Sequence, residues 1–453
     1  MKIFKFGGTS VGSAERMKDV ARLIGADGAP KIVVLSAMSG TTNTLVEISD
    51  CLRNHDSDGA DKATDELSRK YLGLLDRLYD TEAYRQEARK LVEERFDVLR
   101  SFMKQPFGAL EEKIVLAQGE LLSTGLMHLY LRETGVRSVL LAATDFMRID
   151  RHAEPEPPFI KEQLTALLAK YPDDRLFLTQ GFICRNADGA VDNLQRGGSD
   201  YTASLIGEAV QAEEIQIWTD IDGMHNNDPR YVENTLPVRR LHFDEAAELA
   251  YFGAKILHPT CILPAKRNGI PVRLLNTMQP EAVGTTISNE TEEGKIKAVA
   301  AKDHITAIRI KSGRMLLATG FLRQVFEIFE RHETPVDVVT TSEVGVSVTV
   351  DNGKHLDGIV NDLRKYGRVT VDRDLAIICV VGDLKWDNVG FASRIVNALQ
   401  DIPLRMISYG GSNYNVSLLV QASDKQKALQ ALSDHLFNTP SLQCNKELRI
   451  ENE

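Results

Sequence analysis

Short apolar runs alternate with long helix-forming segments over roughly the first 290 residues of the chain. Residues 32–35 form a continuous apolar run, which is typical of a strand buried on both faces of a sheet. Residues 215–219 (IQIWT) are also predicted to form a strand, which ends at Asp220. Because strands that alternate with helices pack as a parallel sheet between helices, we predict an α/β domain with a mostly parallel central sheet.

The pattern changes after a polar, charged segment that begins at Ser288 (SNETEEGKIK). Beyond it, strand and helix patterns follow the order βαββαβ twice within about 150 residues, which is typical of two ferredoxin-like units. We predict a catalytic domain at 1–287, a linker at 288–300, and two small units at 301–374 and 375–453 that can exchange strands. The alternative is a single mixed sheet whose regularity is accidental.

Composition narrows the classes of function that this chain can serve. It carries 54 Lys and Arg against 64 Asp and Glu, which is a net charge of −10. That acidic balance argues against a general nucleic-acid-binding protein, which usually carries a basic surplus. No apolar run is long enough for a transmembrane helix, and the N-terminus lacks the pattern of a signal peptide. We therefore expect a cytoplasmic protein with no nucleic-acid or membrane partner.

The cysteine pattern bears on metal and redox chemistry. The five cysteines are widely spaced and include no CxxC pair; they are Cys51, Cys184, Cys261, Cys379 and Cys444. An odd number at such spacing argues against a disulfide framework and against a structural zinc site. We assign no metal ligand to any side chain.

The first glycine motif is KFGGTSVG, from Lys5 to Gly12. A lysine at a strand end and a glycine pair before a helix suit a phosphate, because glycines let backbone N–H groups approach an anion and Lys5 supplies positive charge. The alternative is a glycine turn that serves tight packing only. The motif is neither a GxxxxGK[ST] phosphate loop nor the GxGxxG dinucleotide motif.

A second glycine pair stands in RGGSD, from Arg196 to Asp200, and again precedes a helix-forming segment. Ser199 or Asp200 could simply cap that helix, but capping explains neither Arg196 nor both glycines. Two such turns in one domain suit a phosphate donor and a second anion that face each other.

Three further charged residues follow along the chain. Asp220 stands at a strand end, where open α/β sheets place ligands. Arg230 is a candidate phosphate contact, or it stabilises its own loop. Lys255 is a second candidate cation, although a lone lysine is usually solvated surface.

Together these motifs resemble those of the aspartate kinases. They occur in the order found in that family, along with VLSAMSGTT, QGELLST, QGF and GAKILHP. The doubled unit resembles paired ACT regulatory domains, and TTSEV from Thr340 to Val344 resembles the lysine-sensitive, single-function members. The resemblance covers essentially the whole chain, and it implies the amino-acid kinase fold followed by two ACT-like units.

The resemblance implies an ATP-dependent aspartate kinase, which transfers the γ-phosphoryl group of ATP to the β-carboxylate of L-aspartate. The product is 4-phospho-L-aspartate, and the reaction starts lysine, threonine and methionine biosynthesis. The acceptor carboxylate is already ionised at neutral pH, since its ordinary pKa is about 3.9, so no general base is required. Catalysis then depends on positioning and charge neutralisation, with Mg²⁺ on the phosphates of ATP.

The resemblance also implies roles for individual residues. Lys5 and Asp200 match the catalytic pair, and Asp200 is expected to orient Lys5 or Mg²⁺. The residues that match the nucleotide site are Lys5, Gly7, Gly8, Thr219, Asp220, His225, Arg230 and Lys255. Those that match the aspartate site are Ser36, Thr42, Glu120, Arg196 and Ser199. Glu120 suits the substrate ammonium, and His225 departs from the family, which often carries Tyr there.

For the tail, the resemblance implies feedback inhibition by L-lysine. The residues that match the lysine-binding interface are Met315, Thr319, Gly320, Phe321, Leu322, Val336, Asp337, Thr341, Ser342 and Glu343. Asp337 or Glu343 is expected to pair with the ligand ammonium. We expect a homodimer or a larger homo-oligomer through the ACT-like region. The alternatives are an amino-acid kinase with another acceptor, such as glutamate, and a non-catalytic amino-acid sensor.

Overall fold

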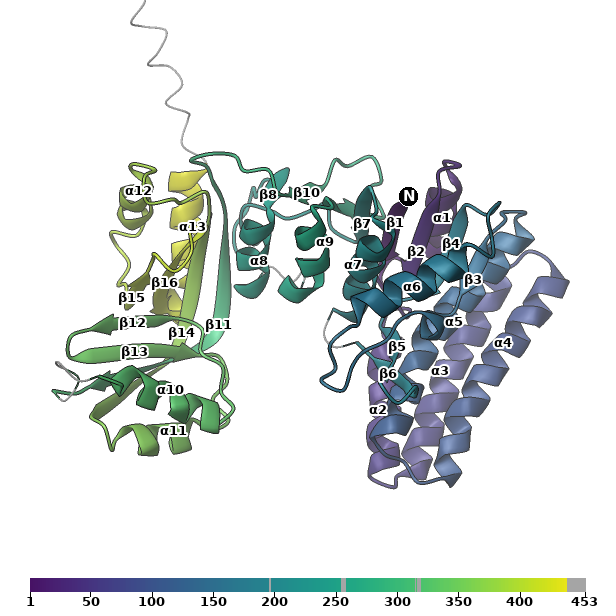
Figure 1. The fold of residues 1–453 in the computed structure, drawn as a ribbon, viewed down its shortest axis with the longest axis horizontal. Helices are drawn as coiled ribbons and strands as arrows, with labels where there is room; N and C mark the ends of the chain where they lie inside the picture. The colour runs from purple at the N-terminus through teal and green to yellow at the C-terminus, as the bar shows by residue number, and fades with distance from the viewer. Residues whose placement is uncertain (195–196, 254–257, 314, 316–318, 438–453) are drawn as a thin grey trace, which may run out of the picture. The chain divides into compact units, whose positions relative to one another are not determined.

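The structure is a computed structural model of the chain and describes residues 1–194, 197–253, 258–313, 315 and 319–437. The chain forms two compact units (Figure 1). The first unit contains Met1–Met224, Arg239–Phe243 and Leu257–Asn289. The second contains His225–Val238, Asp244–Ile256 and Glu290–Glu453.

The first unit is built on an eight-stranded sheet with the strand order β3-β4-β2-β1-β7-β9-β10-β8. The strands of this sheet are β1 (Lys2–Phe6), β2 (Lys31–Leu35), β3 (Val139–Leu141), β4 (Leu176–Gln180), β7 (Glu214–Thr219), β8 (Arg240–His242), β9 (Val272–Asn276) and β10 (Thr285–Ser288). All neighbouring strands are parallel except β9 and β10, which are antiparallel. A separate hairpin pairs β5 (Ile183–Arg185) with β6 (Val191–Asn193). The predicted mostly parallel sheet is confirmed.

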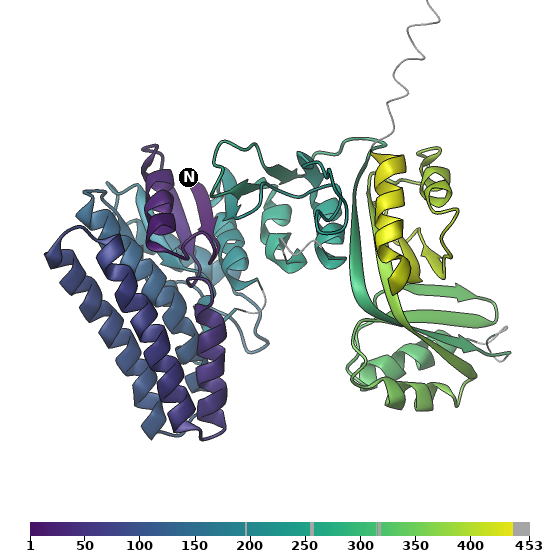
Figure 2. The ribbon, with the colours of Figure 1, turned by 180° about the vertical axis from the view of Figure 1, so that it is seen from behind.

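Successive side chains of a strand point to opposite faces of the sheet, so both faces carry apolar side chains, and helices cover them. Phe4 and Phe6 belong to one core with residues of α1 and α5, whereas Ile3 is buried on the other face. The helices of this unit are α1 (Ala14–Gly25), α2 (Thr41–Arg53), α3 (Ser57–Leu78), α4 (Glu82–Ser101), α5 (Ala109–Glu133), α6 (Pro157–Leu168), α7 (Gly198–Val210) and α9 (Leu263–Asn268). Helices α2 to α5 pack side by side (Figure 2), and α7 packs against β1 and β7.

The second unit is built on one six-stranded antiparallel sheet with the order β12-β13-β11-β14-β16-β15. Its strands are β11 (Ile296–Lys311), β12 (Val339–Ser342), β13 (Gly345–Val350), β14 (Arg368–Gly382), β15 (Met406–Ser408) and β16 (Asn415–Gln421). Its helices are α8 (Phe243–Tyr251, of which Phe243 belongs to the first unit), α10 (Phe321–Arg331), α11 (Leu356–Leu363), α12 (Phe391–Ala398) and α13 (Lys425–Leu436). The two βαββαβ repeats therefore share one continuous sheet.

Two long strands join the repeats. Strands β11 and β14 pair along their whole length, with irregular register between Lys302 and Ala307. One half of the pair packs with α10 and α11, and the other half packs with α12 and α13, so that each repeat keeps its own apolar core. Residues 296–302 of β11 pair with residues 377–382 of β14, so the beginning of β11 contributes to the second repeat.

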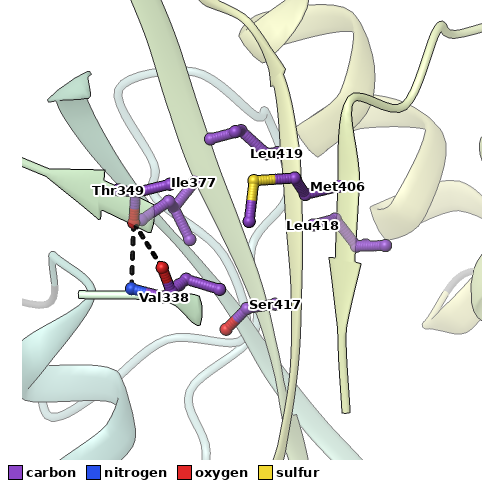
Figure 3. Close-up of a pocket in the computed structure, with 7 residues that line it drawn as sticks. All are labelled: Val338, Thr349, Ile377, Met406, Ser417, Leu418 and Leu419. Carbon is purple, nitrogen blue, oxygen red and sulfur yellow. Dashed lines mark hydrogen bonds between the residues drawn. The ribbon is translucent and has the colours of Figure 1, made fainter. Parts of the chain in front are cut away.

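Figure 3 shows where the two halves of this sheet face each other. Seven side chains line the narrow gap: Val338, Thr349, Ile377, Met406, Ser417, Leu418 and Leu419. The Thr349 hydroxyl accepts a hydrogen bond from the Val338 N–H at 2.9 Å. The gap has no room for a water molecule, so this contact is packing between the halves rather than a ligand site.

Two segments that precede the tail in sequence pack within the second unit. Val232 is buried in the core formed by α12 and α13, and the Asn227 side chain donates to the Leu429 carbonyl at 3.0 Å. Helix α8 is held by a buried ion pair between Glu245 and Lys297 on β11, at 2.9 Å. In the part of the chain that the structure describes, no helix has the length and apolar character needed to cross a membrane.

Candidate active site

Lys5 and Asp200 form an ion pair at the carboxyl edge of the parallel sheet. The Lys5 Nζ atom lies 2.7 Å from Asp200 Oδ1, and the two side chains are only 12% and 13% exposed. Lys5 is near the end of β1, and Asp200 is in the first turn of α7. This edge is where open α/β sheets bind ligands, so the structure brings the predicted catalytic pair together at the expected place.

The turn after β1 is shaped by close backbone packing. A Cβ atom on Gly8 would lie 2.7 Å from the Ala37 carbonyl oxygen, so only glycine fits there. The Gly7 N–H donates to the Trp218 carbonyl at 3.1 Å, and that N–H is therefore committed to the neighbouring strand. A Cβ atom on Gly7 would lie 3.7 Å from Lys5 Nζ. Gly7 consequently keeps the space beside the Lys5 ammonium open.

The start of α7 rests on the loop after β4. Gly198 packs against Phe182, and Ser199 packs against Gly181. Phe182 has a φ of 69°, a left-handed conformation that is rare for an aromatic residue and recurs at functional sites. The Phe182 N–H donates to the Thr202 hydroxyl at 3.0 Å, which helps to hold this strained turn. The turn that carries Ser199 and Asp200 is therefore rigidly supported.

Glu120 is a buried carboxylate on α5. It is 5% exposed, and its Oε1 atom accepts a hydrogen bond from the Ala37 N–H at 3.1 Å. Burial raises the pKa of Glu120 from 4.5 to about 7. Ser36 lies next to that contact, and its carbonyl accepts from the Ser123 hydroxyl at 2.8 Å. Thr42, by contrast, is an exposed residue in the first turn of α2.

The predicted nucleotide residues divide between the two units. Thr219 ends β7 in the first unit, and its hydroxyl donates to the exposed Asp220 carboxylate at 3.1 Å. His225 belongs to the second unit, where its Nδ1 atom lies 2.7 Å from the Thr235 hydroxyl. Arg230 is also in the second unit. Lys255, like the predicted substrate residue Arg196, lies outside the described residues.

Arg230 is held by its own loop. Its guanidinium forms a two-pronged contact with the Asp228 carboxylate, with the shortest distance 2.6 Å, and it is 68% exposed. This pairing raises the pKa of Arg230 above its ordinary value, mainly through the hydrogen bonds with Asp228. The pairing matches the alternative in which Arg230 stabilises a loop.

The predicted effector residues surround the first repeat of the second unit. Gly320 caps α10 in a left-handed conformation with a φ of 86°, and Thr341 and Ser342 lie on the edge strand β12. Asp337 precedes that strand, and its carboxylate is already paired with Lys302 at 2.6 Å. The other predicted effector residues in this region are Met315, Thr319, Phe321, Leu322, Val336 and Glu343.

Comparison with known proteins places these features in a family. The family described as "Amino acid kinase family" matches residues 1–276, and the family described as "ACT domain" matches residues 378–436. The lysine-sensitive aspartokinase 3 of Escherichia coli K12 is 35% identical over 96% of this chain and 99% of its own length. The chain belongs to the aspartokinases. The predicted family, fold class and enzyme class are confirmed.

Solved structures agree with this placement of the aspartokinase chain. E. coli aspartokinase III in complex with aspartate and ADP, in its R-state, matches with a TM-score of 0.82 and 33% identity, over 96% of this chain and 100% of that chain. The same enzyme in complex with lysine and aspartate, in its T-state, matches with a TM-score of 0.79 and 34% identity, over 96% and 99%.

The structure adds residues that sequence reasoning missed. Lys302 and Tyr251 both contact Asp337, the expected effector ligand, and no motif marked either of them. Gln180, the first residue of the QGF motif, ends β4. Its amide links Ala143 and Thr124 through hydrogen bonds of 2.8 and 3.0 Å, so it ties α5 to the sheet near Glu120.

Among the described residues, no group of three or more His, Cys, Asp or Glu side chains could hold a metal ion. Mg²⁺ in kinase sites is usually held by one or two carboxylates together with substrate phosphates, so a cluster is not needed. Asp200 fits that need, because its carboxylate lies at the carboxyl edge of the sheet, where its Oδ1 atom is paired with Lys5.

Proposed function

We propose that this aspartokinase transfers the γ-phosphoryl group of ATP to the β-carboxylate of L-aspartate and produces 4-phospho-L-aspartate. The observation that carries the proposal is the largely buried Lys5–Asp200 pair at the carboxyl edge of the sheet, between two glycine turns. The reaction is the first step towards lysine, threonine and methionine, and we place it in the cytoplasm.

The chemistry needs charge neutralisation rather than a base. The β-carboxylate of aspartate is ionised at neutral pH and can attack phosphorus directly. The Lys5 ammonium stabilises the charge on the transferring phosphoryl group, and Asp200 orients Lys5. Gly8 lets the turn after β1 approach the phosphates closely, and Gly7 leaves the Lys5 ammonium uncovered.

Substrate aspartate is held at its two ends. Glu120 pairs with the α-ammonium, which supplies the positive charge that the buried carboxylate lacks within its own surroundings. Arg196 grips a substrate carboxylate. Ser36, Thr42 and Ser199 complete the substrate site through hydroxyl groups.

The nucleotide is bound by the end of β7 and by the segments that follow it. The proposed nucleotide contacts are Thr219 and Asp220 at the end of β7, together with His225, Arg230 and Lys255. Asp200, whose carboxylate is paired with Lys5, is the side chain that would hold Mg²⁺ together with the ATP phosphates, and the bound ion would neutralise phosphate charge.

Lysine regulates the enzyme through the second unit. Asp337 or Glu343 takes the effector ammonium, and the hydroxyl groups of Thr341 and Ser342 contribute from β12. We further propose that the catalytic domain extends over 1–287, with a linker at 288–300 and ACT-like units at 301–374 and 375–453. The chain assembles as a homodimer or a larger homo-oligomer through that ACT-like region.

A hydroxylamine trap tests the proposal. The purified protein is mixed with MgATP and L-aspartate, with and without L-lysine, and the hydroxamate formed from the acyl phosphate is measured. Hydroxamate that requires aspartate and falls with lysine supports both halves of the proposal. Hydroxamate from glutamate alone would instead indicate a related kinase with another acceptor. No hydroxamate from any acceptor would favour a non-catalytic sensor.

A further inference from the structure

Two side chains, Lys302 and Tyr251, contact the Asp337 carboxylate, which is proposed to bind the effector. Lys302 Nζ lies 2.6 Å from Asp337 Oδ1, and the Tyr251 hydroxyl donates to the same oxygen at 2.7 Å. Lys302 also pairs with Asp351 at 2.9 Å and lies 4.5 Å from the centre of the Tyr251 ring. The Asp337 side chain is only 2% exposed, so Lys302 and Tyr251 close it off from solvent.

Among the described residues, this cluster carries more negative than positive charge. Two carboxylates, Asp337 and Asp351, share the ammonium of Lys302. The second Asp337 oxygen, Oδ2, is buried and has no hydrogen-bond partner in the part of the chain that the structure describes. A buried carboxylate with an unpartnered oxygen is costly, and a second ammonium would neutralise the cluster. The site is therefore suited to bind one further ammonium group.

The cluster is joined to helix α8, which belongs to the stretch matched by the kinase family. Tyr251 is the last residue of α8. Two residues later, Gly253 packs its backbone directly on the Ala301 carbonyl, next to Lys302, with a φ of 125° that excludes other residues. The end of α8 is thus fastened to β11 beside Lys302, four residues before Lys255 in the sequence.

We infer that Lys302 is an internal ammonium that occupies the effector's place on Asp337, and that Tyr251 transmits its replacement to the nucleotide side. When the effector ammonium pairs with Asp337, Lys302 remains with Asp351 and the cluster becomes neutral. The Lys302 ammonium then moves away from the Tyr251 ring, and the hydrogen bond from the Tyr251 hydroxyl to Asp337 is altered. This inference rests on the proposed regulation by lysine, whose ammonium is the chemistry that the site recognises.

The alternative is that Lys302 only stabilises the second unit and does not compete with an effector. Lys425 offers a matched case, since it lies 3.8 Å from the centre of the Tyr231 ring and pairs with Asp303 at 2.8 Å. It has the same Lys–Tyr–Asp composition but no contact with Asp337 among those that the structure describes. Lys425→Met is therefore the control for general loss of a lysine in this unit.

The test uses the full-length protein and two separate measurements. Titration calorimetry measures L-lysine binding without substrates, and the hydroxamate assay measures the KM for ATP with and without lysine. Lys302→Met should bind lysine about tenfold more tightly, because the internal competitor is gone, whereas Lys425→Met should not. Since Lys302→Met leaves a carboxylate unpaired, the double variant K302M/D351N, which keeps the cluster charge, should show the same tightening.

Tyr251→Phe tests transmission separately from binding. It should bind lysine within about threefold of wild type, yet lose most of the lysine-dependent change in the KM for ATP. Unchanged or weaker lysine binding in both Lys302 variants, or full regulation in Tyr251→Phe, would overturn the inference. If the wild-type protein forms no hydroxamate in the absence of lysine, the proposed kinase function is wrong. If it forms hydroxamate but binds no lysine, the inference and the proposed lysine regulation both fail, while the kinase function stands.

Discussion

The Lys5 ammonium lies 2.7 Å from the Asp200 carboxylate, and both side chains are largely shielded from solvent. The parallel sheet creates this pair, because β1 and the turn before α7 end at the same edge. Because the Lys5 ammonium is already held in place, it need not move when negative charge develops on a phosphoryl group near it.

Replacement of Lys5 should mainly reduce kcat. Lys5→Ala removes charge stabilisation in the transition state, so we expect kcat to fall by about 10²- to 10³-fold with a smaller change in the KM for aspartate. Steady-state hydroxamate kinetics measures both values. Lys2→Ala, on the same strand, is the control. A kcat within twofold of wild type for Lys5→Ala would show that the phosphate assignment is wrong.

Asp200→Asn distinguishes an orienting residue from a general base. Because the acceptor carboxylate is already ionised, we expect kcat to fall about tenfold to a hundredfold with an unchanged dependence on pH between 6 and 9. The kcat of wild type and variant is measured across that range. If the variant loses a titration that the wild type shows, Asp200 acts as a base and our mechanism fails.

Gly8→Ala should impair the turn after β1. Its Cβ atom would lie 2.7 Å from a backbone oxygen that cannot move cheaply, so the turn must shift away from Ala37. We expect kcat/KM for ATP to fall at least about tenfold, since small misplacements in a phosphate site are costly. Gly25→Ala is the matched control, because a Cβ atom at the end of α1 meets nothing within 4 Å. Equal activity of the two variants would refute this role of Gly8.

Glu120 should make aspartate binding dependent on pH. Its pKa is raised to about 7 by burial, so in the free enzyme the carboxyl is increasingly protonated, and unable to pair with an ammonium, below that pH. We expect the KM for aspartate to rise about fivefold from pH 7 to pH 6, while the KM for ATP changes little. Glu120→Gln should have a high KM at all pH values. A flat KM profile in the wild-type enzyme would contradict the assignment.

The same shift predicts a trade-off between binding and stability. A carboxyl whose pKa is raised in the folded state binds more protons there than when unfolded, so stability falls as pH rises from 4.5 towards 7 and stays low above it. Glu120→Gln removes this cost, and we expect its Tm without ligand to exceed that of wild type by a few degrees at pH 8 but not at pH 4.5. A lower Tm at pH 8 would show that Glu120 is satisfied in the free fold.

Much of the fold was predictable because its signals are local. The patterns that predicted β2 and β7 depend only on neighbouring residues, and so do the glycine pairs that mark the two turns. The repeated βαββαβ order was also visible. What the pattern left open was whether the repeats are separate, and the long strands β11 and β14 join them in a single sheet.

The pairing of distant charges was beyond local pattern. Nothing in the sequence around Lys302 distinguishes it from a solvated lysine, yet it closes off the Asp337 carboxylate. Likewise Arg230 stands in a motif that predicted a phosphate contact, and the fold shows it paired with Asp228.

The succession of strands and helices and the two glycine turns followed from residues close together in the chain, since each depends on local conformation. The family resemblance followed from the sequence motifs themselves. Tertiary structure alone decided that α8 and the segment from His225 to Val238 pack with the ACT-like unit, and that Glu120 is buried enough for its pKa to rise. The physical reason is that burial and desolvation depend on which distant segments meet, and no local pattern carries that information.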